Sequence, residues 1–378
     1  MGARRLQLRQ DTHHIPAIQS ITHLPPPTRY GQTIQIHNPD FPGLFDDQER
    51  TPYTPQPVQT DIARHSTLLE GGLNAFPHPV APASPLGPVV ASPVPNRIRF
   101  MSLGSGSSGN CCYIGDSQSG FLVDAGVDAP TVVDTLRRHG ISMQHVKGIC
   151  ITHDHSDHMR CVYTLLRKHR HMALYCTPRA LSGIMRRHSV SRRLKDYHVA
   201  IYKEIPFTIG NFTITAFETM HDGTDNAGFF IRHDDRAFTI ATDLGCISPR
   251  VDHYMRQTDY LVIESNYDLE MLRHGSYPEY LKARIQTDNG HMDNLVTAHY
   301  LAEIYTPRLK NVFLCHLSQE NNTPEKALEE SRKALEGIGL KVGEGNDTPA
   351  DFAADIQLVA LPRTGESRFY SFRPDRTR

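Results

Sequence analysis

The stretch ITHDHSDHMR, residues 151–160, places three histidines and two aspartates within six consecutive positions. His153 and His155 are alternate residues behind an apolar run, so in an extended segment their imidazoles point to one side and can converge on a cation. Asp157 and His158 are adjacent, point elsewhere, and suit a second cation. Imidazole and carboxylate ligands together favour Zn²⁺, Fe or Mn²⁺ over Ca²⁺. The stretch therefore indicates part of a metal site, and a histidine-rich polar loop is the alternative in a chain with 22 histidines.

Three residues that could complete this site each lie directly behind another apolar run. His221 follows NFTITAFETM, Asp243 follows AFTIAT, and His316 follows NVFLC. A strand leaves the core at such a point, so its polar tip can face a shared cleft. A single histidine or aspartate after a strand is more often a turn or cap residue. Because all three follow apolar runs in a chain that also carries HxHxDH, we interpret them as further ligands of a two-metal centre.

The elements that would carry these residues alternate between strands and helices from Ile98 onward. Apolar runs and turn signals predict helices at 129–140, about 158–170, 178–188, 292–305 and 324–337. They predict strands at 98–103, 111–115, 121–126, 146–152, 173–177, within 199–243, and at 258–265, 310–316, 355–361 and 367–372. Strands in clusters with helices between them predict one mixed α and β domain over residues 96–378.

Residues 1–95 differ from this domain in composition. They contain 16 of the 26 prolines and no lysine, and PHPVAPASPLGPVVASPVP repeats proline every few residues. Proline at that density blocks both helices and sheet ladders. We therefore expect a disordered extension without a catalytic role, and a partner-binding tail is the alternative.

The overall charge excludes few kinds of partner, whereas the cysteine content indicates the cellular compartment. The net charge of −1 gives no sign of a nucleic-acid, membrane or acidic partner. The seven cysteines form no CxxC pair, which favours reduced thiols and a cytoplasmic location. No apolar run approaches about 18 residues, so we expect no membrane span.

The distribution of charge is more informative than its sum. Between His158 and Lys195 the chain has ten lysines or arginines and no acidic residue. A basic face beside a metal centre suits a polyanion such as nucleic acid, whose binding weakens as salt rises. A solvated surface balanced by acids elsewhere is the alternative reading.

The loop GSGSSGN, residues 104–110, raises the question of a phosphate site. Its glycines and serines can present backbone N–H and hydroxyl groups to an oxyanion. The loop lacks the lysine-serine ending of an ATP-binding loop, so nucleoside triphosphate binding of that kind is not expected. A plain turn between two strands is equally compatible with this composition.

Taken together, HxHxDH at a strand end and His, Asp and His at later strand ends resemble the metallo-β-lactamase superfamily of dinuclear hydrolases. That resemblance implies a four-layer αββα sandwich of two mixed sheets flanked by helices. The segments SGSSGNCCYI, LVDAG, IATDLG, VIESNYDLEMLRHGSYPEYLKARI, NGHMDN and HLSQENNTPE more closely resemble the bacterial YycJ/WalJ group of metal-dependent exonucleases. The resemblance spans residues 98–340 and omits 1–95, with no clear match for 189–198 or 343–352.

The resemblance implies a role for each candidate residue. The first metal would be held by His153, His155 and His221, the second by Asp157, His158 and His316, with Asp243 bridging both. Asp124 would support the HxHxDH loop by accepting hydrogen bonds without binding metal. Ser107, Ser108 and Asn110 become candidate substrate contacts. Glu264, Asn266 and Asp268 would support the site or belong to a lid.

Aspartate at 243, where the lactamase branch places a cysteine ligand, favours phosphate esters over β-lactams, and Cys246 is left out of the site. His291, in NGHMDN at a predicted helix start, resembles a motif that related phosphodiesterases use near the scissile phosphate. It is therefore the candidate that assists the leaving group, with Asp157 sharing proton handling. A histidine at a helix start without a chemical role is the alternative.

These residues predict a phosphodiesterase with two divalent metal ions, Zn²⁺ or Mn²⁺ with Fe also compatible, that uses a metal-bridging hydroxide. By resemblance the substrate would be DNA and the activity a 5′-to-3′ exonuclease. A small-molecule lactonase or thioesterase-like metallohydrolase is the competing enzyme. A nucleic-acid-binding module with structural metals is the non-catalytic alternative. Protein partners and oligomeric state are not predicted.

Overall fold

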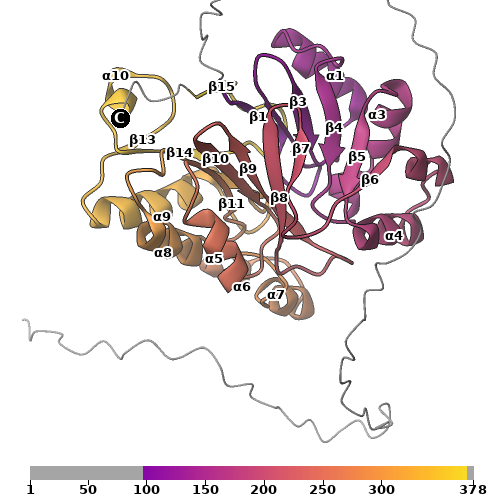
Figure 1. Ribbon diagram of the computed structural model, residues 1–378. Helices are drawn as coiled ribbons and strands as arrows, with labels where there is room; N and C mark the ends of the chain where they lie inside the picture. Colours follow the sequence, from indigo (N-terminus) through magenta and orange to yellow (C-terminus); the bar gives the residue numbers. More distant parts are fainter. Residues whose placement is uncertain (1–96, 373–378) are drawn as a thin grey trace, which may run out of the picture. The chain divides into compact units, whose positions relative to one another are not determined.

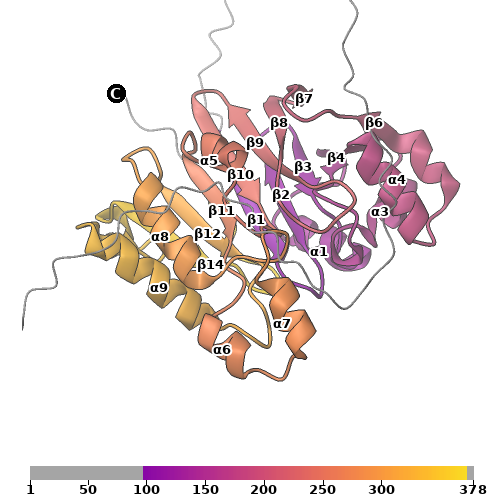
Figure 2. The same cartoon turned by 90° about the horizontal axis from the view of Figure 1, so that it is seen from below.

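A computed structural model describes residues 97–372 of the chain (Figure 1). The predicted disorder of residues 1–95 concerns residues outside this range and stays a prediction. Two β-sheets lie face to face in the described part, and helices cover their outer faces (Figures 1 and 2). This arrangement confirms the predicted αββα sandwich.

The first sheet has seven strands, and strands β3 to β6 run parallel to one another. In spatial order they are β15 (Tyr370–Ser371), β1 (Arg99–Gly104), β2 (Cys111–Gly115), β3 (Gly120–Val123), β4 (Val146–Cys150), β5 (Ala173–Cys176) and β6 (His198–Ala200). Both β3 and β4 end immediately before segments that carry predicted site residues.

The second sheet has eight strands, and β8, β10, β11 and β12 all run in the same direction. In spatial order they are β13 (Val342–Gly343), β14 (Ile356–Ala360), β12 (Asn311–Cys315), β11 (Tyr260–Glu264), β10 (Arg236–Ala241), β9 (Ala227–His233), β8 (Phe212–Glu218) and β7 (Phe207–Ile209). The carboxyl ends of these four strands therefore meet at one edge of the sheet.

The helices lie between the strands in sequence. They are α1 (Ala129–Arg138), α2 (Ser156–Met159), α3 (Val162–Lys168), α4 (Pro178–Arg187), the 3-10 helix η1 (Arg192–Tyr197), α5 (Pro249–Met255), α6 (Leu269–His274), α7 (Glu279–Ile285), α8 (Asn294–Ile304), α9 (Pro324–Gly337) and α10 (Pro349–Phe352). Several begin with a Ser or Thr cap followed by proline. Thr177 before α4 and Thr323 before α9 each accept a hydrogen bond from a backbone N–H of the first turn.

Alternation along the central strands supplies the apolar layers of the sandwich. In β11, Tyr260 and Val262 face the layer between the sheets, whereas Leu261 and Ile263 face the helices α5, α8 and α9. Between the sheets, the Phe100 ring packs 4.8 Å from the Phe313 ring, measured between centroids. Strands covered on both faces are apolar throughout, which explains the uninterrupted apolar runs in the sequence.

The predicted helix at 158–170 is wrong in one respect, because the structure divides it into α2 and α3. The break lies where the backbone pairs with the loop after β3. Ala125 donates its N–H to the His158 carbonyl at 2.7 Å, and Cys161 donates its N–H to the Ala125 carbonyl at 2.9 Å. These bonds hold the HxHxDH segment against the end of β3, at the expense of a continuous helix.

Five further helical segments, η1, α5, α6, α7 and α10, were not predicted from the sequence pattern. Each is only four to seven residues long, too short for an apolar period to stand out. Within residues 97–372 we find no helix that is both long and apolar enough to cross a membrane.

Candidate metal centre

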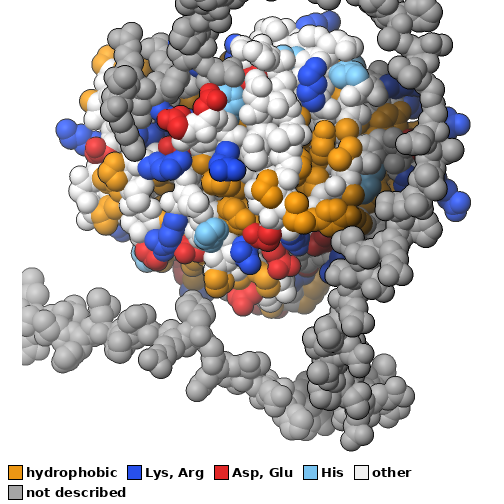
Figure 3. Space-filling view, viewed as in Figure 1, with side chains coloured by type: hydrophobic (Ala, Val, Ile, Leu, Met, Phe, Trp, Pro, Cys, Tyr) orange, Lys and Arg blue, Asp and Glu red, His pale blue; other side chains and the backbone are white. Residues whose placement is uncertain are grey.

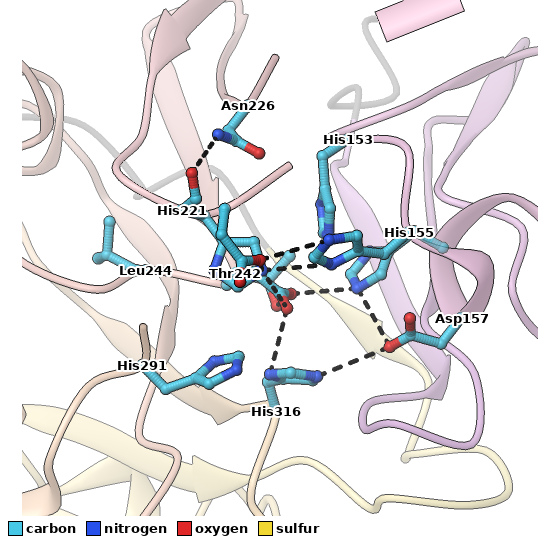
Figure 4. Close-up of polar contacts among 12 residues, drawn as sticks. His153, His155, Asp157, His221, Asn226, Thr242, Leu244, His291 and His316 are labelled. Carbon is cyan, nitrogen blue, oxygen red and sulfur yellow. Dashed lines mark hydrogen bonds and ion pairs between the residues drawn. The ribbon is translucent and has the colours of Figure 1, made fainter. Parts of the chain in front are cut away.

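The predicted ligands gather at the edge where the strands of both sheets end (Figure 4). Within each of four overlapping groups, the candidate ligand atoms lie within 4.8 Å of one another: His153, His155 and His221; His153, His158 and Asp243; Asp157, His158 and His316; and Asp243, Glu264, His291 and His316. Segments up to 163 positions apart in the sequence therefore contribute to one cluster, as the strand-end pattern predicts.

Three residues at this edge have a left-handed backbone conformation. Asp124 follows β3 with φ 62°, Asp243 follows β10 with φ 52°, and His316 follows β12 with φ 53°. This conformation is uncommon for residues other than glycine, although aspartate, asparagine and histidine adopt it more often than the rest. It turns the backbone sharply at the end of each of these strands. Strained backbone of this kind is concentrated at functional sites.

The first group is His153, His155 and His221. Each of these histidines has one ring nitrogen beside a polar neighbour. His153 Nδ1 lies 3.0 Å from Thr152 Oγ1, and its Nε2 is buried without a hydrogen-bond partner. His221 Nδ1 lies 3.0 Å from the Gly290 carbonyl, and its Nε2 lies 3.4 Å from His155 Nδ1. The remaining nitrogen of each ring thus faces the same small volume.

Burial favours the neutral imidazole in two members of this group, His153 and His155. Burial and the neighbouring His158 hold the pKa of His153 well below its usual range. Burial and the neighbouring His221 lower the pKa of His155. Neutral imidazole is the form that binds a metal ion.

The group of Asp157, His158 and His316, called the second group from here on, pairs histidines with carboxylates. His158 Nδ1 lies 2.7 Å from Asp124 Oδ2, and His158 Nε2 lies 3.1 Å from Asp243 Oδ2. His316 Nδ1 lies 2.7 Å from Glu264 Oε1, and its Nε2 has no hydrogen-bond partner. Asp157 Oδ2 lies 3.5 Å from His158 Nε2 and 3.9 Å from His316 Nε2.

The histidine pKa values in the second group are raised, whereas those of His153 and His155 in the first group are lowered. Burial disfavours a charged ring, but Asp243, Asp157 and Glu264 outweigh it and raise the pKa of His316 to about 10. Asp243 and Asp124 likewise raise the pKa of His158 well above its usual range against the effect of burial. Burial opposes ionisation of Asp243, but His316 and His158 lower its pKa well below the usual value. The buried carboxylates therefore require positive charge at this centre.

Asp124, at the end of β3, contacts the HxHxDH segment through its carboxylate. Its carboxylate accepts hydrogen bonds from the Thr152 backbone N–H at 2.9 Å and the Thr152 hydroxyl, in addition to the contact with His158. Asp124 does not belong to any of the ligand groups. It therefore links the end of β3 to the HxHxDH segment and orients one ring in it.

Glu264 has a larger part in the site than the sequence indicated. This fully buried carboxylate, at the end of β11, lies between His316 Nδ1 and His291 Nδ1 at 2.7 and 2.8 Å. Its other oxygen accepts backbone N–H bonds from Leu244 and Met292. Burial opposes its ionisation, but His291 and His316 lower the pKa of Glu264.

His291 lies beside the cluster, at the start of the α8 segment (Figure 4). Its Nδ1 contacts Glu264, and its side chain is 22% exposed, so part of the ring faces outward. A pocket of about 180 Å³ opens here and is lined by His221, His291 and His316 from the cluster and by residues of α7. His291 therefore connects the buried carboxylate to the accessible space.

The loop 104–110 divides into an exposed part and a buried part. Ser107 lines the same pocket and Ser108 is exposed, and their role as substrate contacts stays a prediction. Asn110 is buried, and its amide donates to the Gly106 carbonyl and to Asp157 Oδ2 at 3.2 Å. Ser105 Oγ accepts the His316 backbone N–H at 2.9 Å. The loop thus supports the cluster at its base and borders the pocket at its tip.

Asn266 and Asp268 take structural positions near the site. Asn266 donates from its amide to the His316 carbonyl at 2.6 Å, whereas Asp268 caps α6 by accepting the Met271 N–H at 2.8 Å. Both contacts fix the segment that follows β11. Cys246, which was left out of the predicted site, is in none of the ligand groups of the described residues.

Two aspartates beside the ligands were not predicted. Asp154 points away from the cluster and accepts hydrogen bonds from the Thr224 N–H and hydroxyl, which ties the HxHxDH segment to the loop after His221. Asp222 Oδ1 lies 3.4 Å from His155 Nε2, and Asp222 Oδ2 accepts from Arg284 Nε at 2.8 Å. The alternating direction of neighbouring side chains could have identified Asp154, but no local signal links Asp222 to Arg284.

Comparison with known proteins agrees with this geometry. A family model described as "Beta-lactamase superfamily domain" matches residues 120–316. The chain is 31% identical over 265 residues to a protein named "Exodeoxyribonuclease YycJ" from Bacillus anthracis, covering 69% of this chain and 99% of the relative. It is 33% identical over 264 residues to "Exodeoxyribonuclease WalJ" from Streptococcus pneumoniae serotype 2, strain D39, covering 69% and 98%.

Solved structures show the same fold at low sequence identity. The metallo-β-lactamase fold protein YhfI from Bacillus subtilis superposes with a TM-score of 0.52 at 14% identity, covering 73% of this chain and 100% of that one. The Zn²⁺-bound PqqB from Methylobacterium extorquens superposes with a TM-score of 0.50 at 14% identity, covering 71% and 99%. The chain belongs to the metallo-β-lactamase superfamily, as a protein of the YycJ/WalJ type.

This fold implies divalent metal ions, typically zinc, and the residues of the cluster fit such ions. The donors are imidazole nitrogens and carboxylate oxygens, the set that suits zinc and similar cations. The Nε2 atoms of His153 and His316 are buried without a hydrogen-bond partner, which a metal bond would satisfy. Divalent cations would also supply the positive charge that the buried carboxylates require.

Asp124→Asn tests the support of the ligand set. Asparagine tolerates the left-handed backbone at this position, so the change removes charge from the contact with His158 and leaves the shape. We expect metal affinity to fall about 10- to 100-fold while the protein stays folded, because partners that orient metal-binding histidines have effects of this size. Titration of the metal-depleted protein with Zn²⁺ measures the change. Unaltered affinity would show that Asp124 does not support the site.

Proposed function

We propose that this protein is a metal-dependent exonuclease that removes nucleotides from DNA ends, in the 5′-to-3′ direction. The observation that carries the proposal is the arrangement of the five histidines, each with one ring nitrogen beside a polar neighbour and the other facing a volume shared with Asp157 and Asp243. Relatives that match nearly over their full length are named exodeoxyribonucleases.

In this proposal the cluster holds two divalent cations, Zn²⁺ or Mn²⁺, with Fe also compatible. His153, His155 and His221 would hold one ion, and Asp157, His158 and His316 the other. Asp243 would bridge them, since its Oδ2 lies 3.1 Å from His158 Nε2 and its Oδ1 lies 3.6 Å from His221 Nε2. Ions at these positions would supply Lewis-acid chemistry, activating water and neutralising phosphodiester charge.

A side chain of the protein would protonate the leaving group. Hydrolysis joins a water oxygen to phosphorus and breaks the bond between phosphorus and the 3′-oxygen, which leaves as an alkoxide unless it gains a proton. His291 is placed to donate that proton, because it borders the pocket while its Nδ1 is held by Glu264. Asp157, at the edge of the cluster, would take part in moving the proton released by water.

The surface beside the centre suits a polyanion. All ten lysines and arginines between His158 and Lys195 are exposed. They lie on and around α3, α4 and η1, and Figure 3 shows blue side chains along the margin of the molecule on the side of these elements. The basic stretch predicted from the sequence is therefore a surface, which supports binding of a phosphate backbone.

The competing reading, a lactonase or thioesterase, receives less support from the pocket beside the centre. That pocket is about 180 Å³, and Leu281 and Ile285 are the only aliphatic side chains that line it in the described structure. A pocket for a drug-sized or lipid-like molecule is usually larger and mostly apolar. A small polar pocket with an arginine suits a sugar phosphate better.

Activity of the full chain tests the proposal. The metal-loaded protein is incubated with 5′- and 3′-end-labelled single-stranded and duplex DNA across a salt series, and in parallel with bis(p-nitrophenyl) phosphate, lactones and thioesters. We expect release of mononucleotides from the 5′ end, phosphodiesterase activity on the small ester, and DNA binding that weakens as salt rises. Turnover of lactones or thioesters without cleavage of phosphodiesters would refute the nuclease.

A further inference from the structure

The pocket beside the centre has a wall formed by a helical hairpin. Helices α6 and α7 share a small apolar core of Tyr267, Leu272 and Ile285, separate from the three cores of the sandwich. Lys282 on α7 donates to the Arg273 carbonyl at the end of α6 at 2.8 Å. The hairpin is therefore a packed unit that stands at one side of the centre.

Short backbone contacts fix this wall relative to the cluster. His291 donates its N–H to the Ile285 carbonyl at 2.9 Å, at the end of α7. The Gly290 carbonyl in the same turn lies 3.0 Å from His221 Nδ1. A side chain at Gly290 would collide with the Ile285 and Arg284 carbonyls, so the turn is closely packed. The end of α7 thus has a defined position beside His221 and His291.

Arg284 is the one permanently charged cation among the described residues that line this pocket. Its Nε and one terminal nitrogen contact Asp222 Oδ2, which aligns the guanidinium, and its other terminal nitrogen has no partner among residues 97–372. The Arg284 side chain is 60% exposed. An exposed ion pair contributes little to stability, so the pair is better explained by what the aligned guanidinium binds.

We propose that Arg284 binds the 5′-terminal phosphate of the DNA strand, so that the enzyme selects ends that carry this phosphate. The inference rests on the proposed function and names the chemical group that it recognises. Guanidinium groups bind phosphate through paired, charge-assisted hydrogen bonds. Asp222 holds Arg284 without closing it off, and Ser107 and Ser318 line the same pocket with hydroxyl groups.

The position of His291 determines which phosphate this is. If His291 protonates the leaving 3′-oxygen, the nucleotide that carries this oxygen lies on the His291 side of the cluster, in the pocket. Both His291 and Arg284 line that pocket. In the proposed 5′-to-3′ reaction this nucleotide is the terminal one, so its remaining phosphate is the 5′-phosphate.

The test compares DNA with a 5′-phosphate and the same DNA with a 5′-hydroxyl, using the metal-loaded full chain. Wild-type protein is expected to have a kcat/KM about tenfold or more higher on the phosphorylated strand, the effect of one charge-assisted contact. Arg284→Gln should reduce this preference to about one, mainly by raising KM on the phosphorylated strand. Arg284→Lys should retain only part of the preference, because lysine lacks the planar fork.

Arg273→Gln is the matched control, since Arg273 is an exposed arginine of the same hairpin that pairs with Glu270 outside the pocket. It should keep the wild-type preference. Metal content and hydrolysis of bis(p-nitrophenyl) phosphate are measured alongside. A wild-type enzyme that is active on DNA but indifferent to the 5′-phosphate overturns the role of Arg284 and leaves the exonuclease standing. Equal loss on both strands with loss of metal would show that Arg284 acts through Asp222 on the histidines. Absence of DNA cleavage would instead refute the proposed function itself.

Discussion

Asp243→Ala is expected to abolish turnover of every phosphodiester substrate while the protein remains folded. Asp243 is buried at the centre of the cluster, with its oxygens near His158, His221 and His316. A change to a residue that only orients a ligand costs about 10- to 100-fold in metal affinity or activity, so loss of the bridging carboxylate should exceed about 100-fold. Metal content per chain and the rate on labelled DNA measure the effect.

Asp234→Ala provides the control for the backbone. Asp234 has φ 54°, nearly the same as φ 52° at Asp243, but its side chain is 69% exposed in the turn between β9 and β10. Alanine in this conformation costs roughly 1–2 kcal/mol in either variant, so Asp234→Ala measures the backbone contribution to any stability that Asp243→Ala loses. Only Asp243→Ala should lose metal and activity. If Asp243→Ala keeps its full activity, the two-ion assignment is wrong. If it binds DNA normally and the wild-type protein shows no turnover, the non-catalytic reading is favoured.

The position of the centre could be predicted because it depends on local sequence features. His153, His221, Asp243 and His316 all follow apolar runs long enough to be recognised as strands. Strands that run in one direction end at one edge of a sheet, so polar residues at these ends meet whatever the order of the strands. The αββα arrangement followed from the resemblance, and the structure confirms it.

The partners of the ligands could not be predicted, because they depend on which strands are neighbours. Glu264 reaches both His316 and His291 because β11 lies between β12 and β10 and α8 begins beside its end. The contact between Asp222 and Arg284 joins residues 62 positions apart through a short helix that the apolar period did not reveal. The broken helix at 158–170 has the same origin, since its break depends on backbone contacts with Ala125.

His291→Ala is expected to impair DNA cleavage far more than cleavage of bis(p-nitrophenyl) phosphate. A 3′-alkoxide is a poor leaving group and needs a proton, whereas p-nitrophenolate leaves without one. We expect kcat on DNA to fall about 10²- to 10⁴-fold, the usual contribution of general acid catalysis. On bis(p-nitrophenyl) phosphate the decrease should stay below about tenfold. His299→Ala, a change at an exposed histidine of α8, the helix that begins just after His291, should leave both rates unchanged.

The comparison with Glu264→Gln separates proton donation from support of the metal ions. Glu264 contacts His291 and also the predicted ligand His316, so its loss should lower metal content and both rates together. His291 lies at the rim of the cluster and is 22% exposed, so its removal should leave the metal content at the wild-type level. If His291→Ala slowed both substrates equally, or released metal, then His291 would hold the site together and the proton for the leaving 3′-oxygen would have to come from another group.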